Sequence, residues 1–504
     1  MNKENSTEKT HTINTNTNVT TTYYTQLFIN NCFVDSLSKT SIPVINPCNE
    51  TVICHVQEGR QDDIDLAVEA AKVAFPAWAN LPIDQKAKLF FTLADRLEAQ
   101  KEEYAFLECV DNGKIYSDAV GDISEVINVI RYYGGWSDKI TGTTFTTYDD
   151  YTIQSRRVPF GPCGLIAPWN YPLLMCAWKV FPALAAGNTV VLKPSEETPL
   201  TILKICSLFR EVGFPKGVIN VVPGYGHLAG DRLTNHKDIL KVSFTGSTGV
   251  GRMVMKNSAE SNLKQVTLEL GGKSPIVVCD DADLDLAAHW IIDASFRNTA
   301  QNCCAGSRIY VQEGVYDKLL KIVLEKVGHL KFGDSFNENT YFGPLINERQ
   351  FKRVLGFIEH GIQVEKMRVQ HGGKRMFDKG YYVEPTIFSE VPDNSKLARE
   401  EIFGPVMLFM TPFKTLKEGI ARAKDTDYGL AAGIFSRDQS ACELFVRSVD
   451  AGTIWVNNYN NTSYNIPFGG FKQSGFGRDN GPEAIHEYTT MKSVYYLNDF
   501  KKYE

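Results

Sequence analysis

Cys303 is the residue whose surroundings most clearly suggest chemistry. It lies in FRNTAQNCCAGSR (296–308), where polar side chains flank it and Gly306 gives the backbone freedom. A cysteine whose environment favours the thiolate is a strong nucleophile. The alternative interpretation is a small core residue, which is what most free cysteines are. Cys304 competes directly for the nucleophilic role.

Glu269 stands near the end of an otherwise apolar stretch, QVTLEL (265–270), and two glycines follow it. A carboxylate at the end of a buried strand can face a cleft and act as a general base. A cap for the next turn, or a structural salt bridge, would explain the residue equally well. Both interpretations remain open on this segment alone.

Asn170 lies between two prolines in APWNYP (167–172). Pro168 and Pro172 restrain the backbone on both sides, so the amide is expected to keep one orientation. An amide held in this way can donate to a developing oxyanion. The alternative is an Asx-turn, in which the side chain bonds its own backbone.

A glycine-rich turn, FTGSTGVG (244–251), follows a predicted strand and opens a predicted helix. The backbone N–H groups of such a turn can meet a pyrophosphate. The segment lacks G-x-G-x-x-G, and a glycine-rich turn by itself is weak evidence for a dinucleotide site.

Helical and strand patterns alternate along the chain. A helix is expected from Pro199 to Gly213, and others near 283–296 and 315–327. Strands separated by helices predict an α/β fold with a doubly wound parallel sheet, which binds ligands at the carboxyl ends of its strands. A second α/β domain is expected from Gly271. The strands are predicted at 189–193, 217–222, 241–245, 265–270, 275–279 and 308–312.

Two alternating segments, 151–158 and 493–497, fit neither domain. Sheet edges of this length are usually covered, often by another subunit. We therefore expect a homo-oligomer, either a dimer or a tetramer.

The bulk composition excludes several classes of protein. The 504 residues carry a net charge of -6 and have a pI near 5.9, so nucleic acid is not expected as a partner. Eleven cysteines without regular spacing favour a reducing compartment over a disulfide framework, and none has zinc spacing, so no metal is expected.

The first 22 or so residues are rich in Thr and Asn, and we predict that residues 1–26 form a disordered tail. They lack the features of a secretory signal or transit peptide, so a cytoplasmic location is expected. The stretch 160–192 contains one charged residue, Lys179, but four prolines interrupt it. It is interpreted as a buried part of a large enzyme, so no membrane association is expected.

Taken together, these segments resemble the aldehyde dehydrogenase superfamily from about residue 27 to residue 500. The resemblance implies a Rossmann-like cofactor domain at 27–140 and 161–270, a catalytic domain at 271–477, and a small β oligomerisation arm at 141–160 and 478–504. The motifs that carry it are APWNYP, LKPSEETPL, FTGST, VTLELGGKSP, the Cys303 segment, EEIFGPV (400–406) and PFGGFKQSGFGRDNG (467–481).

The resemblance implies a role for each matching residue. Cys303 matches the nucleophile, Glu269 the base, and Asn170 the amide that stabilises the oxyanion together with the backbone N–H of Cys303. Lys179 matches a lysine proposed to relay protons from Glu269. The cofactor positions are matched by Pro168 and Trp169, by Lys193 and Glu196 for the adenosine ribose, by Gly246, Ser247 and Gly251 for the pyrophosphate, and by Glu401 and Phe403 for the nicotinamide half.

Two positions depart from the family pattern. Ala300 stands where the family usually has glycine, and its methyl group could shift the nucleophile slightly. Asp479 stands where the proposed relay partner of Lys179 is usually glutamate, and the shorter side chain puts that relay in doubt.

The implied reaction oxidises an aldehyde to a carboxylic acid through a thiohemiacetal and a thioester on Cys303. We expect NAD to be preferred and NADP to be used more weakly, because Glu196 would repel a 2′-phosphate. An inactive relative with a binding or structural role is the alternative of another class.

The substrate is less defined than the reaction. Tyr171 and Trp178 match aromatic positions of the family's substrate tunnel, and Phe468 is a third candidate, although core packing alone would explain such residues. A general small-molecule aldehyde is the favoured substrate. The segment NNYN (457–460) is similar to betaine-aldehyde and aminoaldehyde dehydrogenases, so cationic aldehydes remain the alternative.

Overall fold

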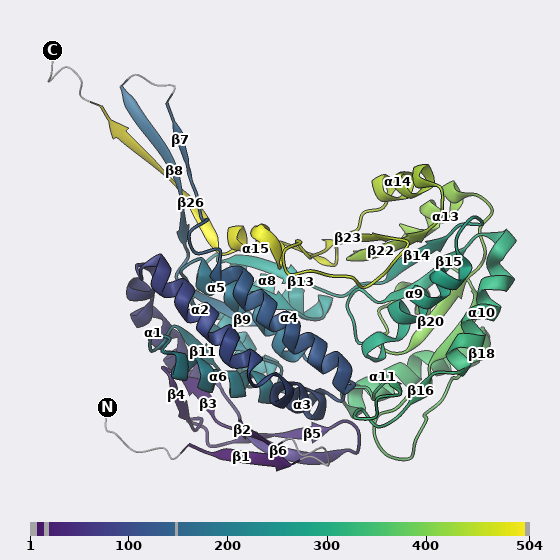
Figure 1. The fold of residues 1–504 in the computed structure, drawn as a ribbon, viewed down its shortest axis with the longest axis horizontal. Coiled ribbons are helices and arrows are strands. Elements are labelled where there is room, and N and C mark those ends of the chain that lie inside the picture. Colours follow the sequence, from purple (N-terminus) through teal and green to yellow (C-terminus); the bar gives the residue numbers. More distant parts are fainter. Residues whose placement is uncertain (1–7, 15–19, 147–149, 499–504) are drawn as a thin grey trace.

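The computed structural model describes residues 8–14, 20–146 and 150–498. Two large sheets dominate this part of the chain, and a slender three-stranded sheet projects from the body (Figure 1). The predicted α/β fold with a doubly wound, mainly parallel sheet is confirmed.

The first sheet has eight strands, of which the central five are parallel. In its middle strand Val190 and Leu192 pack into one core cluster and Val191 into another, on the opposite face. Apolar residues at successive positions suit a strand that helices cover on both sides. In spatial order the strands are β25 (Gly475–Phe476), β13 (Gln265–Glu269), β12 (Lys241–Thr245), β9 (Pro162–Ile166), β10 (Thr189–Lys193), β11 (Ile219–Val221), β3 (Leu27–Ile29) and β4 (Cys32–Val34).

Helices on the two faces of this sheet separate into two groups. One face packs against α1 (Gln61–Ala79), α7 (Asp231–Asn235) and α8 (Thr248–Ser261). On the other face lie α2 (Ile83–Glu98), α3 (Lys101–Asn112), α4 (Tyr116–Gly134), α5 (Pro172–Ala185) and α6 (Leu200–Val212). Helix α6 ends at Gly213, whose φ of +95° suits glycine, close to the predicted end.

The second sheet has seven strands, and all of its pairs are parallel except the first. Its strands are β18 (Arg368–His371), β19 (Thr386–Val391), β20 (Val406–Met410), β15 (Gly306–Val311), β14 (Ser274–Val278), β22 (Ala431–Phe435) and β23 (Thr453–Val456). The helices of this half are α9 (Leu284–Phe296), α10 (Tyr316–Gly328), α11 (Glu348–Glu359), α12 (Lys396–Arg399), α13 (Leu416–Ala423) and α14 (Gln439–Ser448).

The projecting sheet joins two segments that are far apart in the sequence. Strand β8 (Tyr151–Pro159) pairs along its whole length with β26 (Thr489–Leu497), and β7 (Thr143–Phe145) adds a third antiparallel strand. The short pairs elsewhere are β1 (Thr10–Asn14) with β2 (Thr20–Tyr24), β5 (Ser41–Asn46) with β6 (Thr51–Gln57), β16 (Lys331–Phe332) with β17 (Thr340–Phe342), and β21 (Tyr428–Gly429) with β24 (Phe471–Lys472).

The prediction of a disordered tail over residues 1–26 is wrong for the described part of that segment. Strands β1 and β2 form a hairpin there. Thr21 and Tyr23 are buried, and the Lys204 ammonium on α6 donates to Thr21 Oγ1 (2.8 Å). A tail of low average hydrophobicity is ordered here because a few of its side chains pack on a neighbouring helix. Residues 1–7 and 15–19 lie outside the described residues.

Two further segments differ from the predicted organisation. Strand β25 pairs with β13, so residues 475–476 belong to the first sheet although we assigned 271–477 to the second domain. Residues 481–487 form helix α15 (Gly481–Glu487), which packs beside α5, so that part of 478–504 is not in the projecting sheet. In the described residues we find no helix with the length and apolar character needed to cross a membrane.

Candidate active site

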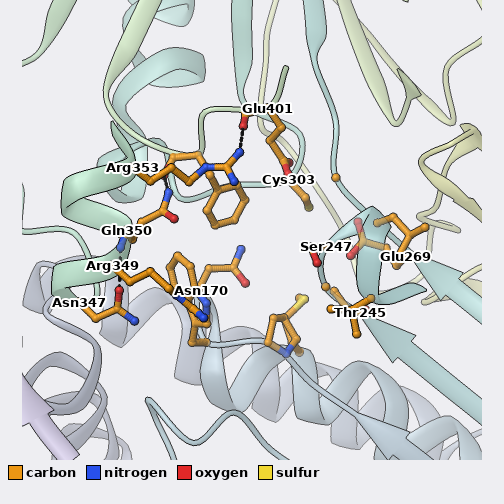
Figure 2. A pocket seen from close by; sticks show the side chains of 18 residues that line it. Asn170, Thr245, Ser247, Glu269, Cys303, Asn347, Arg349, Gln350, Arg353 and Glu401 are labelled. Carbon is orange, nitrogen blue, oxygen red and sulfur yellow. Dashed lines mark hydrogen bonds between the residues drawn. The ribbon is translucent and has the colours of Figure 1, made fainter. Parts of the chain in front are cut away.

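A cavity of about 520 Å³ opens where the carboxyl ends of the first sheet face the second half of the molecule. Figure 2 shows Glu269 and Ser247 on one side of it, the side chains of α11 on the other, and Cys303 and Asn170 between them. Nine of the predicted site residues line this cavity: Cys303, Glu269, Asn170, Pro168, Trp169, Gly246, Ser247, Glu401 and Phe403.

The loop that carries Cys303 has an unusual backbone. Helix α9 ends at Phe296, and Asn298, Thr299 and Ala300 then take φ values of +51°, +58° and +54°. Residues with side chains rarely adopt this left-handed conformation, and three in succession need support from the surroundings. Part of that support comes from the Asn298 side chain, which donates to the backbone oxygen of Asn170 (3.0 Å).

The environments of the two adjacent cysteines separate their roles. Cys303 lines the cavity, whereas Cys304 is buried and its thiol donates to Asn302 Oδ1 (3.3 Å). Only Cys303 is therefore placed to meet a substrate in this cavity. The neighbouring Cys304 thiol, burial and the nearby Glu269 carboxylate raise the pKa of Cys303 well above its usual value. This raised pKa favours the thiol over the thiolate, so the attack of Cys303 on a carbonyl needs a base that takes its proton.

Glu269 is the last residue of β13, at the cavity edge of the sheet. Both carboxylate oxygens are buried, and no hydrogen bond of standard geometry reaches them from the described residues, but the Cys303 thiol is close enough to act on the pKa of this carboxyl. Burial raises the pKa of Glu269 to about 8, although the charge of Lys179 acts in the opposite direction. A carboxylate with this pKa can accept a proton near neutral pH, as a general base must. A helix or turn cap, or a structural salt bridge, would not need a raised pKa.

The Asn170 side chain reaches across to the cysteine loop. Its Nδ2 donates to the backbone oxygen of Gln301 (2.9 Å), a residue far away in the sequence. This bond fixes the amide beside Cys303 and differs from the local bond of an Asx-turn. One N–H of the amide is thereby used, and the other is available to a ligand in the cavity.

Lys179 lies behind Glu269 and does not line the main cavity. Its ammonium contacts Asp479 Oδ2 (2.9 Å) and Ser243 Oγ (3.2 Å). The shorter aspartate therefore does reach the lysine, which answers the doubt raised by this departure from the family pattern. Lys179, Asp479 and Glu269 also line one small cavity of about 10 Å³, close to the size of one water.

A second cavity of about 510 Å³ adjoins the first and shares Pro168, Trp169 and Gly246 with it. Lys193 and Glu196 line this second cavity, and their side chains form an ion pair of 2.8 Å. Burial pushes the pKa of Glu196 upward, but the charge and hydrogen bond of Lys193 outweigh it and hold that pKa below its usual value.

Gly246 and Gly251 serve different purposes. A Cβ at Gly246 would lie 2.6 Å from the Phe244 ring, at the turn where both cavities meet. Gly251 lines neither large cavity, so the structure does not support a direct role in cofactor binding. It lies within α8, where a Cβ would come 2.6 Å from the Leu270 side chain, and its small size lets the helix pack closely on the segment after β13.

Glu401 and Phe403 enter the first cavity from the loop before β20. The backbone N–H of Gly272 donates to Glu401 Oε1 (3.0 Å), and burial raises the pKa of Glu401 to about 7. Phe403 has a φ of +61°, and its ring meets the Trp169 ring edge-on at 5.3 Å. These contacts fix both side chains beside Cys303.

Helix α11 contributes side chains to the site that no sequence motif indicated. Asn347, which caps this helix, and three helix residues line the first cavity, and Arg349 lines the second as well. Charged residues on an amphipathic helix are usually interpreted as a solvated face. The polar positions 347, 350 and 353 recur every three residues, and that spacing could have indicated one shared face. The helix residues are Arg349, Gln350 and Arg353.

The three predicted substrate aromatics do not line either large cavity. Trp178 and Phe468 are nearly fully buried and pack against each other edge-on, with ring centroids 5.4 Å apart. The Lys114 ammonium lies 4.4 Å from the centroid of the Tyr171 ring. Packing partners therefore contact all three rings, and of the three only Phe468 meets other predicted site residues, since it lines the small cavity shared by Lys179 and Glu269.

Comparison with known proteins places these features in context. A family model described as "Aldehyde dehydrogenase family" matches residues 33–494. Omega-crystallin of Enteroctopus dofleini is 46% identical, over 94% of this chain and 96% of that protein. An aldehyde dehydrogenase of Emericella nidulans is 47% identical, over 93% and 94%. A solved NAD+ complex of an aldehyde dehydrogenase from Bacillus cereus has a TM-score of 0.92 at 44% identity, over 94% and 96%. These matches confirm the resemblance that the motifs indicated.

Proposed function

The chain belongs to the aldehyde dehydrogenase family, and from this premise we propose that it oxidises an aldehyde to a carboxylic acid with NAD through a thioester on Cys303. One observation carries the proposal. The Cys303 thiol, the Glu269 carboxylate and the Asn170 amide line a single cavity at the carboxyl ends of the first sheet. A nucleophile, a base and an oxyanion donor are the groups that this chemistry needs.

The residues present suit an extended dinucleotide. The two adjoining cavities of about 520 and 510 Å³ meet at the turn before α8, where a side chain at position 246 would be blocked by Phe244. Lys193 and Glu196 would hold the adenosine ribose in one cavity, and Glu401 and Phe403 the nicotinamide half in the other. NAD bound in this way would supply the hydride acceptor of the oxidation.

The first chemical step belongs to Cys303. Glu269 accepts the thiol proton, and the sulfur adds to the aldehyde carbon to form a thiohemiacetal. The free N–H of Asn170 and the backbone N–H of Cys303 stabilise the oxygen that becomes negative. Loss of a hydride from the carbon then leaves a thioester on Cys303.

Hydrolysis uses the same carboxylate again. Once the thiol proton has left it, Glu269 takes a proton from water, the hydroxide adds to the thioester carbon, and the carbon–sulfur bond breaks to release the carboxylic acid and the Cys303 thiolate. Lys179 and Asp479, on the far side of Glu269, are positioned to pass the accumulated proton away from the cavity. Covalent capture thus divides one oxidation into two easier steps.

A continuous assay with propanal and NAD tests this function, with absorbance of the reduced nicotinamide as the readout. Turnover that disappears on alkylation of Cys303 is expected. One relative has a crystallin name and not a dehydrogenase name, so an inactive binding protein is the competing hypothesis. Absence of turnover with every aldehyde of a broad panel, with NAD and with NADP, would favour that hypothesis.

Cationic aldehydes are a second candidate substrate class, favoured by one polar chain beside the nucleophile. Asn302 Nδ2 donates to Asn460 Oδ1 (3.3 Å), and Asn460 Nδ2 donates to Asp293 Oδ2 (2.8 Å). This chain leads from the residue before Cys303 to a half-buried carboxylate. Comparison of kcat/KM for propanal, betaine aldehyde and aminobutyraldehyde decides between the classes, because a general enzyme would favour propanal.

We further propose a homodimer or homotetramer assembled through the projecting sheet. Tyr495, Tyr496 and Leu497 of β26 are exposed large side chains on this sheet, which suits burial against another copy. Light scattering of the intact chain and of a variant with these three residues changed to serine tests this assignment. An unchanged mass would contradict it.

The organisation of the chain supports two smaller proposals. We assign the cofactor domain to the residues around the first sheet and the catalytic domain to those around the second, because the chain passes between the sheets after Glu269.

We also propose a cytoplasmic location, because all eleven cysteines are free thiols, as in a reducing compartment.

A further inference from the structure

Lys273 is a buried amine that the proposed mechanism does not use. Its side chain is 2% exposed, and among the described residues its Nζ has no hydrogen-bond partner. Burial of an unpaired ammonium is costly, and apolar residues of similar length fit such positions without this cost. The position of Lys273 therefore calls for an electrostatic explanation.

The segment that carries Lys273 lies between Cys303 and Glu401. A Cβ at Gly272 would come 2.5 Å from the Cys303 backbone oxygen, and the Gly272 N–H donates to Glu401 Oε1 (3.0 Å). Lys273 and Glu401 also line the same small cavity of about 20 Å³. This space is large enough for one water that could link the amine to the carboxylate.

The other charges near Lys273 do not neutralise it. Arg308 on β15 donates to the Lys273 backbone oxygen (2.9 Å), to Tyr310 and to the Ala423 backbone, and its positive charge disfavours a second cation. Arg353 on α11 acts in the same direction, whereas Glu400 and Glu401 favour the ammonium, Glu401 more strongly. Glu401 is therefore the main counter-charge available to Lys273.

We propose that Lys273 is a positioning residue that keeps Glu401 ionised and oriented, so that Glu401 can accept hydrogen bonds from the hydroxyls of the nicotinamide ribose. This inference rests on the proposed use of NAD. It assigns Lys273 an electrostatic role toward the cofactor, whereas Cys303 and Glu269 act on the aldehyde.

The ionisation of the pair supports this role. Burial lowers the pKa of Lys273 to about 7 and raises the pKa of Glu401 to about 7, while the Gly272 N–H, the charge of Arg353 and then the charge of Lys273 act to lower the latter. Removal of the amine should therefore raise the pKa of Glu401. A protonated Glu401 is a poorer acceptor for a ribose hydroxyl, so NAD affinity should decline at a higher pH than in the wild type.

Lys273→Met tests the proposal, because methionine keeps most of the side-chain length without the charge. NAD binding is measured by titration calorimetry from about pH 6 to about pH 9 for the wild type and the variant. We expect the acidic decline of NAD affinity to move upward by about one pH unit in the variant, with up to about tenfold weaker binding near pH 7. The two affinities should converge at the alkaline end.

Two matched variants separate this effect from a structural one. Lys86→Met removes another buried lysine, on α2 and outside both large cavities, and should leave the NAD profile unchanged. In a Glu401→Gln background, Lys273→Met should have no further effect on NAD affinity, because the group that it acts through is absent.

Each outcome bears on a separate claim. If the wild type does not bind NAD, the proposed function fails. If the wild type binds NAD and the Lys273→Met profile superimposes on it, only the role of Lys273 is overturned. A shift that persists in the Glu401→Gln background would also overturn it, because the lysine would then act by another route.

Discussion

The active-site cavity has one wall built from the first sheet and another built from loops of the second half, and the two walls hold their residues in different ways. Glu269 is the last residue of β13 and Asn170 lies in the loop just after β9, and the positions of these strand ends are set by the parallel ladder. Cys303 lies on a loop with three left-handed residues. Its position depends instead on individual side-chain bonds, such as that from Asn298 to Asn170.

This difference determines what a substitution should do. The backbone at a strand end keeps its position when the side chain is substituted. Such a substitution should therefore lower activity with little effect on the structure around it. A residue on the strained loop depends on its neighbours, so changes nearby can move it. The following predictions test this contrast, beginning with the largest expected effect.

Cys303→Ser should lower steady-state turnover by at least about a thousandfold, because a serine hydroxyl loses its proton far less readily than a thiol and stays a weak nucleophile even beside Glu269. NAD should still bind, as measured by calorimetry. Cys304→Ser is the matched control and should keep most activity, since Cys304 is buried outside the cavity. If the Cys304 variant were the inactive one, the assignment of the nucleophile would be off by one residue.

Glu269→Gln should lower steady turnover by about a hundred- to ten-thousandfold, while a single, slower burst of reduced cofactor remains, because solvent can take the thiol proton in place of Glu269 and hydride transfer precedes hydrolysis. Stopped-flow absorbance separates the burst from the steady phase. Loss of the burst as well would show that no other base can replace Glu269 in deprotonating Cys303. Full steady turnover would remove Glu269 from the mechanism.

Glu196→Gln should reduce the preference for NAD over NADP. The wild type should prefer NAD by about ten- to hundredfold in kcat/KM, because a carboxylate near the 2′-phosphate costs about 1–3 kcal/mol. The ion pair with Lys193 moderates this repulsion, so NADP is disfavoured and not excluded. Equal use of both cofactors by the wild type would contradict the prediction, and an unchanged ratio in the variant would exclude Glu196 as its cause.

Glu269 should make turnover rise with pH and should make the stability of the native state fall with pH. Its pKa is about 8 in the fold, so turnover limited by hydrolysis should rise about tenfold per pH unit below that value and level off above it. Between the usual carboxyl pKa and about 8 the unfolded chain loses this proton while the fold retains it. The native state should therefore lose stability as pH rises through this window, and Glu269→Gln should remove that contribution to the pH dependence of Tm.

Ala300→Gly should raise the free energy of unfolding by less than about 1 kcal/mol. Glycine avoids the cost of the left-handed conformation, but part of that gain is lost to its greater freedom in the unfolded chain. Thermal unfolding is the measurement. Ala305→Gly is the control, because Ala305 lacks a positive φ and should be slightly destabilised by the change. A destabilised Ala300 variant would show that the methyl group contributes packing that outweighs the strain.

Sequence patterns predicted the first wall better than the second. Strands 189–193 and 241–245 appear as predicted, because continuous apolar residues leave few alternatives to a buried strand. Cys303 was located by its motif, but the left-handed backbone at 298–300 before it was not predicted, since it is supported by bonds to distant residues, such as those from Asn298 and Thr299. Arg349 and Arg353 were missed for a related reason. A charged helix face looks the same in a sequence whether it meets solvent or a cavity.

The last part of the chain has a consequence for synthesis on the ribosome. Strand β25 forms the edge of the first sheet beside β13, and Asp479 pairs with Lys179 behind Glu269. Nascent domains generally fold from the N-terminus as they emerge. In this protein the sheet that carries the base cannot be completed until residues 475–479 have left the exit tunnel. A ribosome that stalls shortly before this point leaves a nascent chain that already contains Cys303 and Glu269 but has no finished active site.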